Sequence, residues 1–289
     1  MNRLVKVLLV TTAVSAALLS FLWRDTFDAE SLRGARVLVT GSSKGIGEQM
    51  AYHYARFGAQ IVITARSEDA LLKVAERCQE LGAQRVLQVA ADMSVPADSK
   101  RVVAFAVEKL QGGLDYLVLN HIGSSNFAMW DGDVEHIRTL MQVNFLSYAQ
   151  MTSSALPALK ESGGAIVVVS SIAGKLSTPF VAPYTATKFA LTGFFGTLQQ
   201  ELAMQKANVS VTICMLGLID TESAMKKVRE KVNMKAAPAT EAALEIIRSG
   251  ATRQKELYYP FLAQLLCLSR DFLPAVRDWI IQSSFSSQP

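Results

Sequence analysis

Six short β-rich runs, separated by segments long enough to form helices, constrain the fold of this chain most strongly. In chain order the runs are Arg36–Thr40, Ile61–Thr64, Val86–Ala90, Tyr116–Leu119, Ala165–Val169 and Val209–Met215. Alternation of this kind places successive strands in one mainly parallel sheet with helices packed on both faces. The sequence therefore predicts a doubly wound α/β fold.

Length and composition fit one large domain. The chain has 289 residues, half of them hydrophobic, which is enough to bury a full core. Its composition does not break between residues 31 and 289, so this stretch is predicted to be a single catalytic domain with a helical tail. The net charge is only +4 and the basic residues are scattered, which argues against a nucleic-acid surface. The cysteines and histidines show no metal-ligand spacing, so no metal site is predicted.

The N-terminal segment predicts a membrane association. Val7–Trp23 is uncharged and mostly apolar, with Arg3 and Lys6 before it and acidic residues after it. The run is longer than a usual signal-peptide core, which favours an uncleaved signal-anchor within residues 1–30 over a cleaved signal peptide. Because the basic flank of the segment is expected to stay in the cytosol, the catalytic domain is predicted to lie in the lumen of the endoplasmic reticulum. If the segment is cleaved, the protein is predicted to be secreted. The sequon Asn208–Ser210 agrees with luminal exposure and glycosylation.

A glycine-rich turn follows the first β-rich run. Its three glycines are spaced Gly-x3-Gly-x-Gly and precede a helical pattern over Ile46–Phe57. Glycine allows a tight turn and a close approach of a diphosphate, while the following helix N-terminus favours an anion. The spacing predicts a Rossmann-type dinucleotide site, and the alternative is an ordinary strand-to-helix turn. The residues predicted to hold the cofactor here are Gly41, Ser42, Ser43, Lys44, Gly45, Ile46 and Gly47.

The end of the second run bears on which dinucleotide binds. An NAD site usually has a carboxylate there, but this chain has Arg66 and Ser67. A guanidinium matches phosphate oxygens, so Arg66, helped by Lys44 and Ser43, predicts NADP(H). The alternative is a solvated arginine at the start of a loop.

Polar residues also follow the next two runs. Asp92, beside Met93, could contact adenine or cap the next helix. Asn120, His121 and Ile122 end the fourth run, at the sheet edge where such folds bind ligands. All five residues are predicted to contact the cofactor.

The loop after the sixth run is a predicted lid that spans about Leu218 to Val232. Ile219 and Thr221 are expected near the nicotinamide carboxamide, with Ser223 close behind. The tail from residue 258 to residue 281 is expected to form helices that pack against a dimer partner or the core. Contact with a membrane surface is the alternative for this basic, apolar tail.

Tyr184 and Lys188 form the predicted catalytic centre, because positions four apart lie on one helix face. Moving a tyrosine pKa from ~10 to about 7 needs roughly 4 kcal/mol. One cation at about 4 Å supplies roughly that free energy at an effective dielectric near 20. Ser171 is predicted to orient the substrate oxygen, and Asn144 to hold a water that relays protons to Lys188.

With the glycine turn, Asn120, Asn144, Ser171 and Tyr184-x3-Lys188 in register, the chain resembles the short-chain dehydrogenase/reductase family over nearly everything after residue 30. The resemblance implies a catalytic tetrad: Tyr184 as general acid/base, Lys188 as its pKa-lowering neighbour and ribose ligand, Ser171 as oxygen orienter, and Asn144 in the proton relay. Hydride transfer with the nicotinamide is implied too.

Further stretches resemble the 11β-hydroxysteroid dehydrogenase type 1 branch of that family, including its type-1-like members. The matching stretches are Asn120–Ile122, Val143–Tyr148, Val168–Ser171, Leu216–Thr221 and the N-terminal anchor. This resemblance implies an NADP(H)-linked homodimer that interconverts a hydroxyl and a ketone on a steroid, such as an 11-hydroxy or 11-oxo glucocorticoid.

Two positions depart from that branch. Type 1 carries a tyrosine where this chain has Thr178, a predicted substrate contact. A broader carbonyl or retinoid reductase, or an idle NADP-binding lipid scaffold, therefore stays open. Thr187 stands where serine or alanine is usual, and it is expected to face solvent or packing rather than the reacting oxygen.

Overall fold

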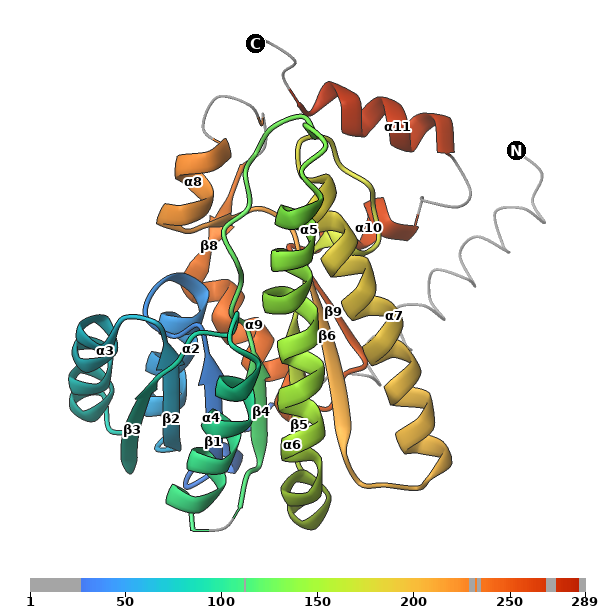
Figure 1. Ribbon diagram of the computed structural model, residues 1–289. Coiled ribbons are helices and arrows are strands. Elements are labelled where there is room, and N and C mark those ends of the chain that lie inside the picture. The colour runs from blue at the N-terminus through green and yellow to red at the C-terminus, as the bar shows by residue number, and fades with distance from the viewer. Residues whose placement is uncertain (1–26, 112, 229–231, 233–234, 269–273, 286–289) are drawn as a thin grey trace, which may run out of the picture.

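The central element of the computed structural model is a seven-stranded sheet (Figure 1). The structure describes residues 27–111, 113–228, 232, 235–268 and 274–285. All strand pairs in this sheet are parallel, in the order β3-β2-β1-β4-β5-β6-β9, which confirms the predicted doubly wound α/β fold. The strands are β1 (Arg36–Thr40), β2 (Gln60–Ala65), β3 (Arg85–Ala90), β4 (Tyr116–Leu119), β5 (Ala165–Val169), β6 (Ser210–Leu216) and β9 (Glu256–Tyr259).

The edge strand β9 was not expected from the sequence, which placed its second half in a helical tail. It pairs in parallel with β6, with Cys214 opposite Leu257. A strand of four residues is too short to show a clear period, so only tertiary pairing reveals it. A second small sheet joins β7 (Ile219–Asp220) to β8 (Ala237–Pro238) and braces the predicted lid.

Helices cover both faces of the sheet, as the alternation predicts. Short 3-10 helices η1 (Ala29–Leu32) and η3 (Ile172–Gly174), and a π-helical turn η2 (Gln142–Leu146), interrupt the chain between them. The α-helices are α2 (Gly45–Arg56), α3 (Glu68–Glu80), α4 (Pro96–Lys109), α5 (Val134–Met141), α6 (Ser147–Ser162), α7 (Ala182–Met204), α8 (Glu222–Val228), α9 (Ala239–Ala251), α10 (Leu262–Leu268) and α11 (Pro274–Ser283).

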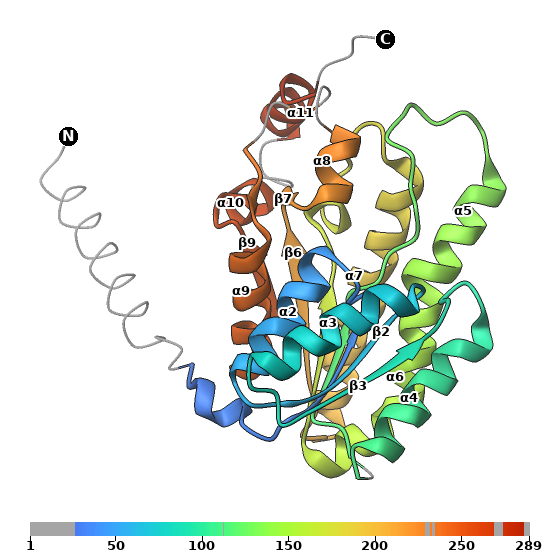
Figure 2. The ribbon, with the colours of Figure 1, turned by 90° about the vertical axis from the view of Figure 1, so that its left-hand side faces the viewer.

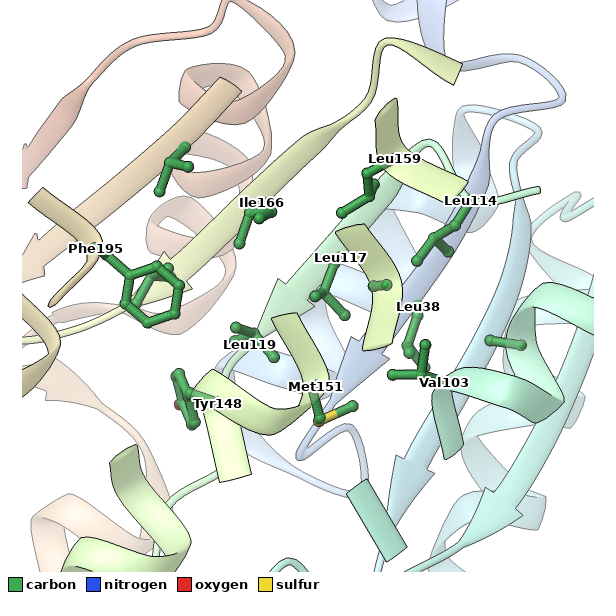
Figure 3. Close-up of a cluster of buried hydrophobic side chains, with 14 of the residues drawn as sticks. Leu38, Val103, Leu114, Leu117, Leu119, Tyr148, Met151, Leu159, Ile166 and Phe195 are labelled. Atoms are coloured by element: carbon green, nitrogen blue, oxygen red, sulfur yellow. The ribbon is translucent and has the colours of Figure 1, made fainter. Parts of the chain in front are cut away.

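Two hydrophobic clusters fix these layers to the sheet. On one face α4, α6 and α7 pack against the strands through residues such as Met151, Phe195 and Ile166 (Figure 3). On the other face α2, α3 and α9 bury residues that include Tyr54 and Ile246. The strand order reverses between β1 and β4, and ligands of such sheets bind at the carboxyl ends of the strands beside that reversal.

The predicted signal-anchor falls in residues 1–26, outside the described residues. Within the part that the structure describes, no helix is long and apolar enough to cross a membrane. The ring of Phe27 packs 5.9 Å from that of Phe57. Asn208 of the sequon is exposed, and its Oδ1 accepts a hydrogen bond from Arg253 at 2.6 Å. Its glycosylation stays a prediction.

Candidate active site

A cavity of about 310 Å³ lies at the carboxyl ends of the central strands. Its volume is in the range of small-molecule sites. Four residues predicted for catalysis or substrate contact line it together: Ser171, Thr178, Tyr184 and Lys188. The predicted cofactor contacts that also line it are Ile46, Asn120, Ile122, Ile219, Thr221 and Ser223.

The first turns of α7 bring Tyr184 and Lys188 to the cavity, since the helix begins at Ala182. Lys188 is only 1% exposed, and its Nζ donates a 3.0 Å hydrogen bond to the carbonyl oxygen of Val169. The same Nζ lies 5.4 Å from the centroid of the Tyr184 ring. The two side chains therefore lie side by side at the cavity, and a common contact of the Tyr184 hydroxyl and the Lys188 ammonium stays a prediction.

Burial sets the pKa values of this pair. Desolvation raises the pKa of Tyr184 to about 12, against a hydrogen bond with Ser171 that lowers it. Desolvation also lowers the pKa of Lys188 to about 7. The expected fall of the Tyr184 pKa toward neutrality is therefore not found, because loss of hydration outweighs the hydrogen bond with Ser171. At neutral pH the tyrosine keeps its proton, and the lysine readily gains or loses one.

Ser171 reaches the cavity because it lies two residues beyond Val169, the last residue of β5. Its Oγ caps η3 by accepting a 3.2 Å hydrogen bond from the N–H of Ala173. This bond fixes the hydroxyl beside Tyr184. Both hydroxyls can therefore meet one substrate oxygen.

Asn144 lies fully buried in the π-helical turn η2. Its Oδ1 accepts a 2.7 Å hydrogen bond from the N–H of Gly123, and its Nδ2 donates at 3.2 Å to Oγ1 of Thr187. Thr187 Oγ1 in turn donates at 2.7 Å to the carbonyl oxygen of Tyr184. Thr187 was expected to face either solvent or the packed interior. It is fully buried, so the packed placement is confirmed and the solvent placement is wrong. Both ends of the Asn144 amide are engaged, so its role in a water-mediated relay stays a prediction.

The glycine turn packs tightly against β4. Gly41 has φ +66°, and a Cβ at this position would lie 2.8 Å from Cα of His121. A Cβ on Gly47 would clash with the carbonyl oxygen of Gly41. Asn120 stabilises the turn, because its Nδ2 donates hydrogen bonds to the carbonyl oxygens of Thr40 at 3.0 Å and Gly41 at 3.2 Å. Because these glycines carry no side chains, the backbone at the start of α2 is left uncovered, which fits a dinucleotide diphosphate.

Two predicted cofactor residues turn their side chains into the core. Ser42 Oγ donates at 2.5 Å to the carbonyl oxygen of Val39. The His121 ring lies 2.9 Å from Thr40 Oγ1 and 2.7 Å from Ser147 Oγ. Desolvation lowers the pKa of His121 to about 3, so the ring is neutral. These residues can reach a cofactor only through their backbone atoms.

Three further predicted contacts have structural roles. Met93 is 5% exposed and belongs to the core. Ser67 caps α3, and its Oγ accepts from the N–H of Ala70 at 3.3 Å. Asp92 accepts from the N–H of Ser94 at 2.9 Å, in a turn before α4. The helix-cap alternative for Asp92 is wrong, because the residue at the cap position of α4 is Val95.

Arg66 extends into solvent beyond the end of β2. Within the described residues its side chain has no hydrogen bond or ion pair. The N–H of Ser94 is the main reason that the pKa of Asp92 is lowered, and the nearby charge of Arg66 contributes. Arg66 is therefore available to an anion in solvent, and its contact with a cofactor stays a prediction.

Aromatic residues that the sequence reasoning missed complete the cavity wall. Phe127 and Phe285 line the cavity, with ring centroids 6.3 Å apart. Phe180 lies 5.4 Å from Phe127 and 6.2 Å from Phe285. These rings come from segments far apart in the chain, so no local pattern could have indicated the cluster.

Comparison with known proteins shows which family the chain resembles. A family model described as "short chain dehydrogenase" matches residues 35–232. The chain is 57% identical to the hydroxysteroid 11-beta-dehydrogenase 1-like protein of Danio rerio, over 97% of this chain and 98% of that one. It is 61% identical to the Gallus gallus protein of the same name, over 86% of each chain. An alcohol dehydrogenase from Thermococcus sibiricus, complexed with 5-hydroxy-NADP, superposes with a TM-score of 0.68 at 27% identity, over 77% of this chain and 94% of that one.

Proposed function

Because the chain belongs to the short-chain dehydrogenase/reductase family, we propose that it is an NADP(H)-dependent hydroxysteroid dehydrogenase. It would interconvert a hydroxyl and a ketone on a steroid, with 11-hydroxy and 11-oxo glucocorticoids as the leading substrates. One observation supports this most strongly: Ser171, Tyr184 and Lys188 line a single cavity beside a glycine turn that fits a dinucleotide. The names of the relatives support the steroid class.

In the proposed reaction a nicotinamide cofactor, when bound, gives hydride to the substrate carbon or takes it away. Tyr184 supplies the proton to the ketone oxygen, which suits a group that stays protonated at neutral pH. Ser171 holds the same oxygen by a hydrogen bond. As the tyrosine loses its proton, Lys188 provides the positive charge that stabilises the tyrosinate in surroundings with little water.

The aromatic cluster supports a flat, apolar substrate. Phe127 and Phe285 line the cavity with aromatic side chains, whereas Thr178 contributes no aromatic ring to the part of the wall that it forms. A steroid can stack its face on such rings. The same features would also accept a retinoid, which is the second candidate substrate class.

A substrate panel tests the proposed function. Purified protein would be assayed with NADPH and 11-oxo steroids, with NADP⁺ and 11-hydroxy steroids, and with retinal and retinol. We expect the highest kcat/KM with a steroid. Faster turnover of retinal than of every steroid would replace the steroid proposal, and no turnover of any compound would favour a lipid-binding scaffold.

The proposed preference for NADP(H) rests on Arg66, which is unpaired among the described residues, together with Lys44 and Ser43 of the glycine turn. Arg66→Asp should reduce the kcat/KM ratio of NADPH over NADH by about 100-fold, because a carboxylate repels the 2′-phosphate and accepts ribose hydroxyls. Lys73→Asp makes the same charge change on exposed α3 and should leave the ratio within about twofold. Equal use of NADH and NADPH by the unmodified enzyme would contradict the assignment.

We further propose a homodimer held at the endoplasmic reticulum membrane with the catalytic domain in the lumen. The apolar run Val7–Trp23 and the sequon at Asn208 support this placement. Secretion is the alternative if the N-terminal segment is cleaved.

A further inference from the structure

A lysine that the tetrad does not include lies at the cavity. Lys227 belongs to α8, which lies within the predicted lid, and lines the cavity while remaining exposed to solvent. Ribbon views from two sides show α8 beyond the carboxyl ends of the strands (Figure 2). Its neighbour Lys226 is exposed but does not line the cavity.

The start of the predicted lid lies against the glycine turn. A Cβ built on Gly45 would lie 3.3 Å from Cγ2 of Thr221, the residue just before α8. Thr221 Oγ1 accepts a 3.3 Å hydrogen bond from the N–H of Ala224, which fixes the first turn of that helix. The start of the lid is therefore held against the turn where a diphosphate is expected.

The charge of Lys227 interacts with that of Lys44 in the glycine turn. Lys44 is the residue before α2, where its side chain makes no capping hydrogen bond. Partial desolvation lowers the pKa of Lys227, and repulsion from Lys44 adds to that shift. Neither lysine has an ion-pair partner in the described ranges. Two unpaired like charges near a helix N-terminus are unfavourable until an anion binds beside them.

We propose that Lys227 holds the diphosphate of the dinucleotide from the side of α8, so that the predicted lid binds the cofactor directly. This inference rests on the proposed function, since it needs a nicotinamide dinucleotide in the cleft. It assigns Lys227 a different task from Arg66 and Lys44. Those two residues are proposed to select the 2′-phosphate, whereas Lys227 acts on a group that NADPH and NADH share.

Binding measurements without any steroid test this proposal. The dissociation constants of NADPH and NADH would be measured by nucleotide fluorescence at low and high salt for the full chain, for Lys227→Met and for Lys226→Met. Lys227→Met should weaken both nucleotides by about fivefold to tenfold, with a smaller loss of affinity on adding salt. Lys226→Met removes the same charge from the adjacent exposed position and should change either constant by less than about twofold.

The outcomes separate this inference from the proposed function. If Lys227→Met binds both nucleotides as tightly as the unmodified chain does, the inference is overturned. This holds even if the variant has a raised KM for a carboxylated or sulfated steroid, because the lysine would then act on the substrate and not on the cofactor. Weakened binding of NADPH alone would also overturn it, because the lysine would then contact the 2′-phosphate. If the unmodified chain binds neither nucleotide, both the inference and the proposed function are wrong.

Discussion

Replacing Tyr184 by phenylalanine should lower kcat at least about 1,000-fold, because the reaction loses its proton donor and acceptor. The ring is kept, so the cavity wall and the contact with Lys188 change little. The dissociation constant of NADPH should stay within about twofold. Steady-state kinetics and nucleotide fluorescence on the same preparation would show this separation of catalysis from binding.

A matched control for this variant is Tyr52→Phe. Tyr52 lies on α2 outside the cavity, where its hydroxyl donates a 2.9 Å hydrogen bond to Glu48. Removing that hydroxyl should leave kcat within about twofold. If Tyr184→Phe keeps most of the activity of the unmodified enzyme, another group transfers the proton.

Lys188→Met should change activity and stability in opposite directions. Activity should fall about 100-fold to 10,000-fold, because no cation then stabilises the tyrosinate. The free energy of unfolding at pH 7 should nevertheless rise by about 1–3 kcal/mol, since methionine is buried without desolvating an ammonium group. The gain is reduced because the carbonyl of Val169 loses its hydrogen-bond donor. A surface change, Lys160→Met, should alter neither quantity much.

The pH dependence of stability identifies the source of that gain. The pKa of Lys188 is about 7 in the folded protein, below the value of about 10.4 for an unfolded lysine. Between these values the unfolded chain binds a proton that the folded chain does not, so this group makes the native protein more stable as pH rises from 7 to 10. Urea unfolding across that range should show this rise in the unmodified protein and lack it in Lys188→Met. Parallel pH profiles would show that Lys188 is not buried as described.

Local patterns in the sequence predicted the fold and the catalytic cluster because their information is short-range. The β-rich runs, the glycine turn and the four-residue spacing of Tyr184 and Lys188 each lie within one element or one connection. The doubly wound topology then brings the strand ends together. Spacing alone could not show how strongly burial raises the pKa of Tyr184, so the expected fall of that pKa is not found.

Features that depend on distant segments could not be predicted in this way. Phe285 reaches the cavity from the end of the described chain, and Lys227 reaches it from α8. The partnership of Asn144 with Thr187 joins η2 to α7. Each of these contacts appears only when helices and loops are packed on the sheet.

Transfer of deuterium from labelled cofactor to product tests the proposed hydride-transfer chemistry most directly. The purified protein would reduce an 11-oxo steroid with NADPH that carries deuterium at the transferable position, and the product would be examined by mass spectrometry. One deuterium on the carbon that bears the new hydroxyl is the predicted result, with almost none formed by Tyr184→Phe in the same time. A steroid that is not reduced, or a product without deuterium, would contradict the proposed reaction.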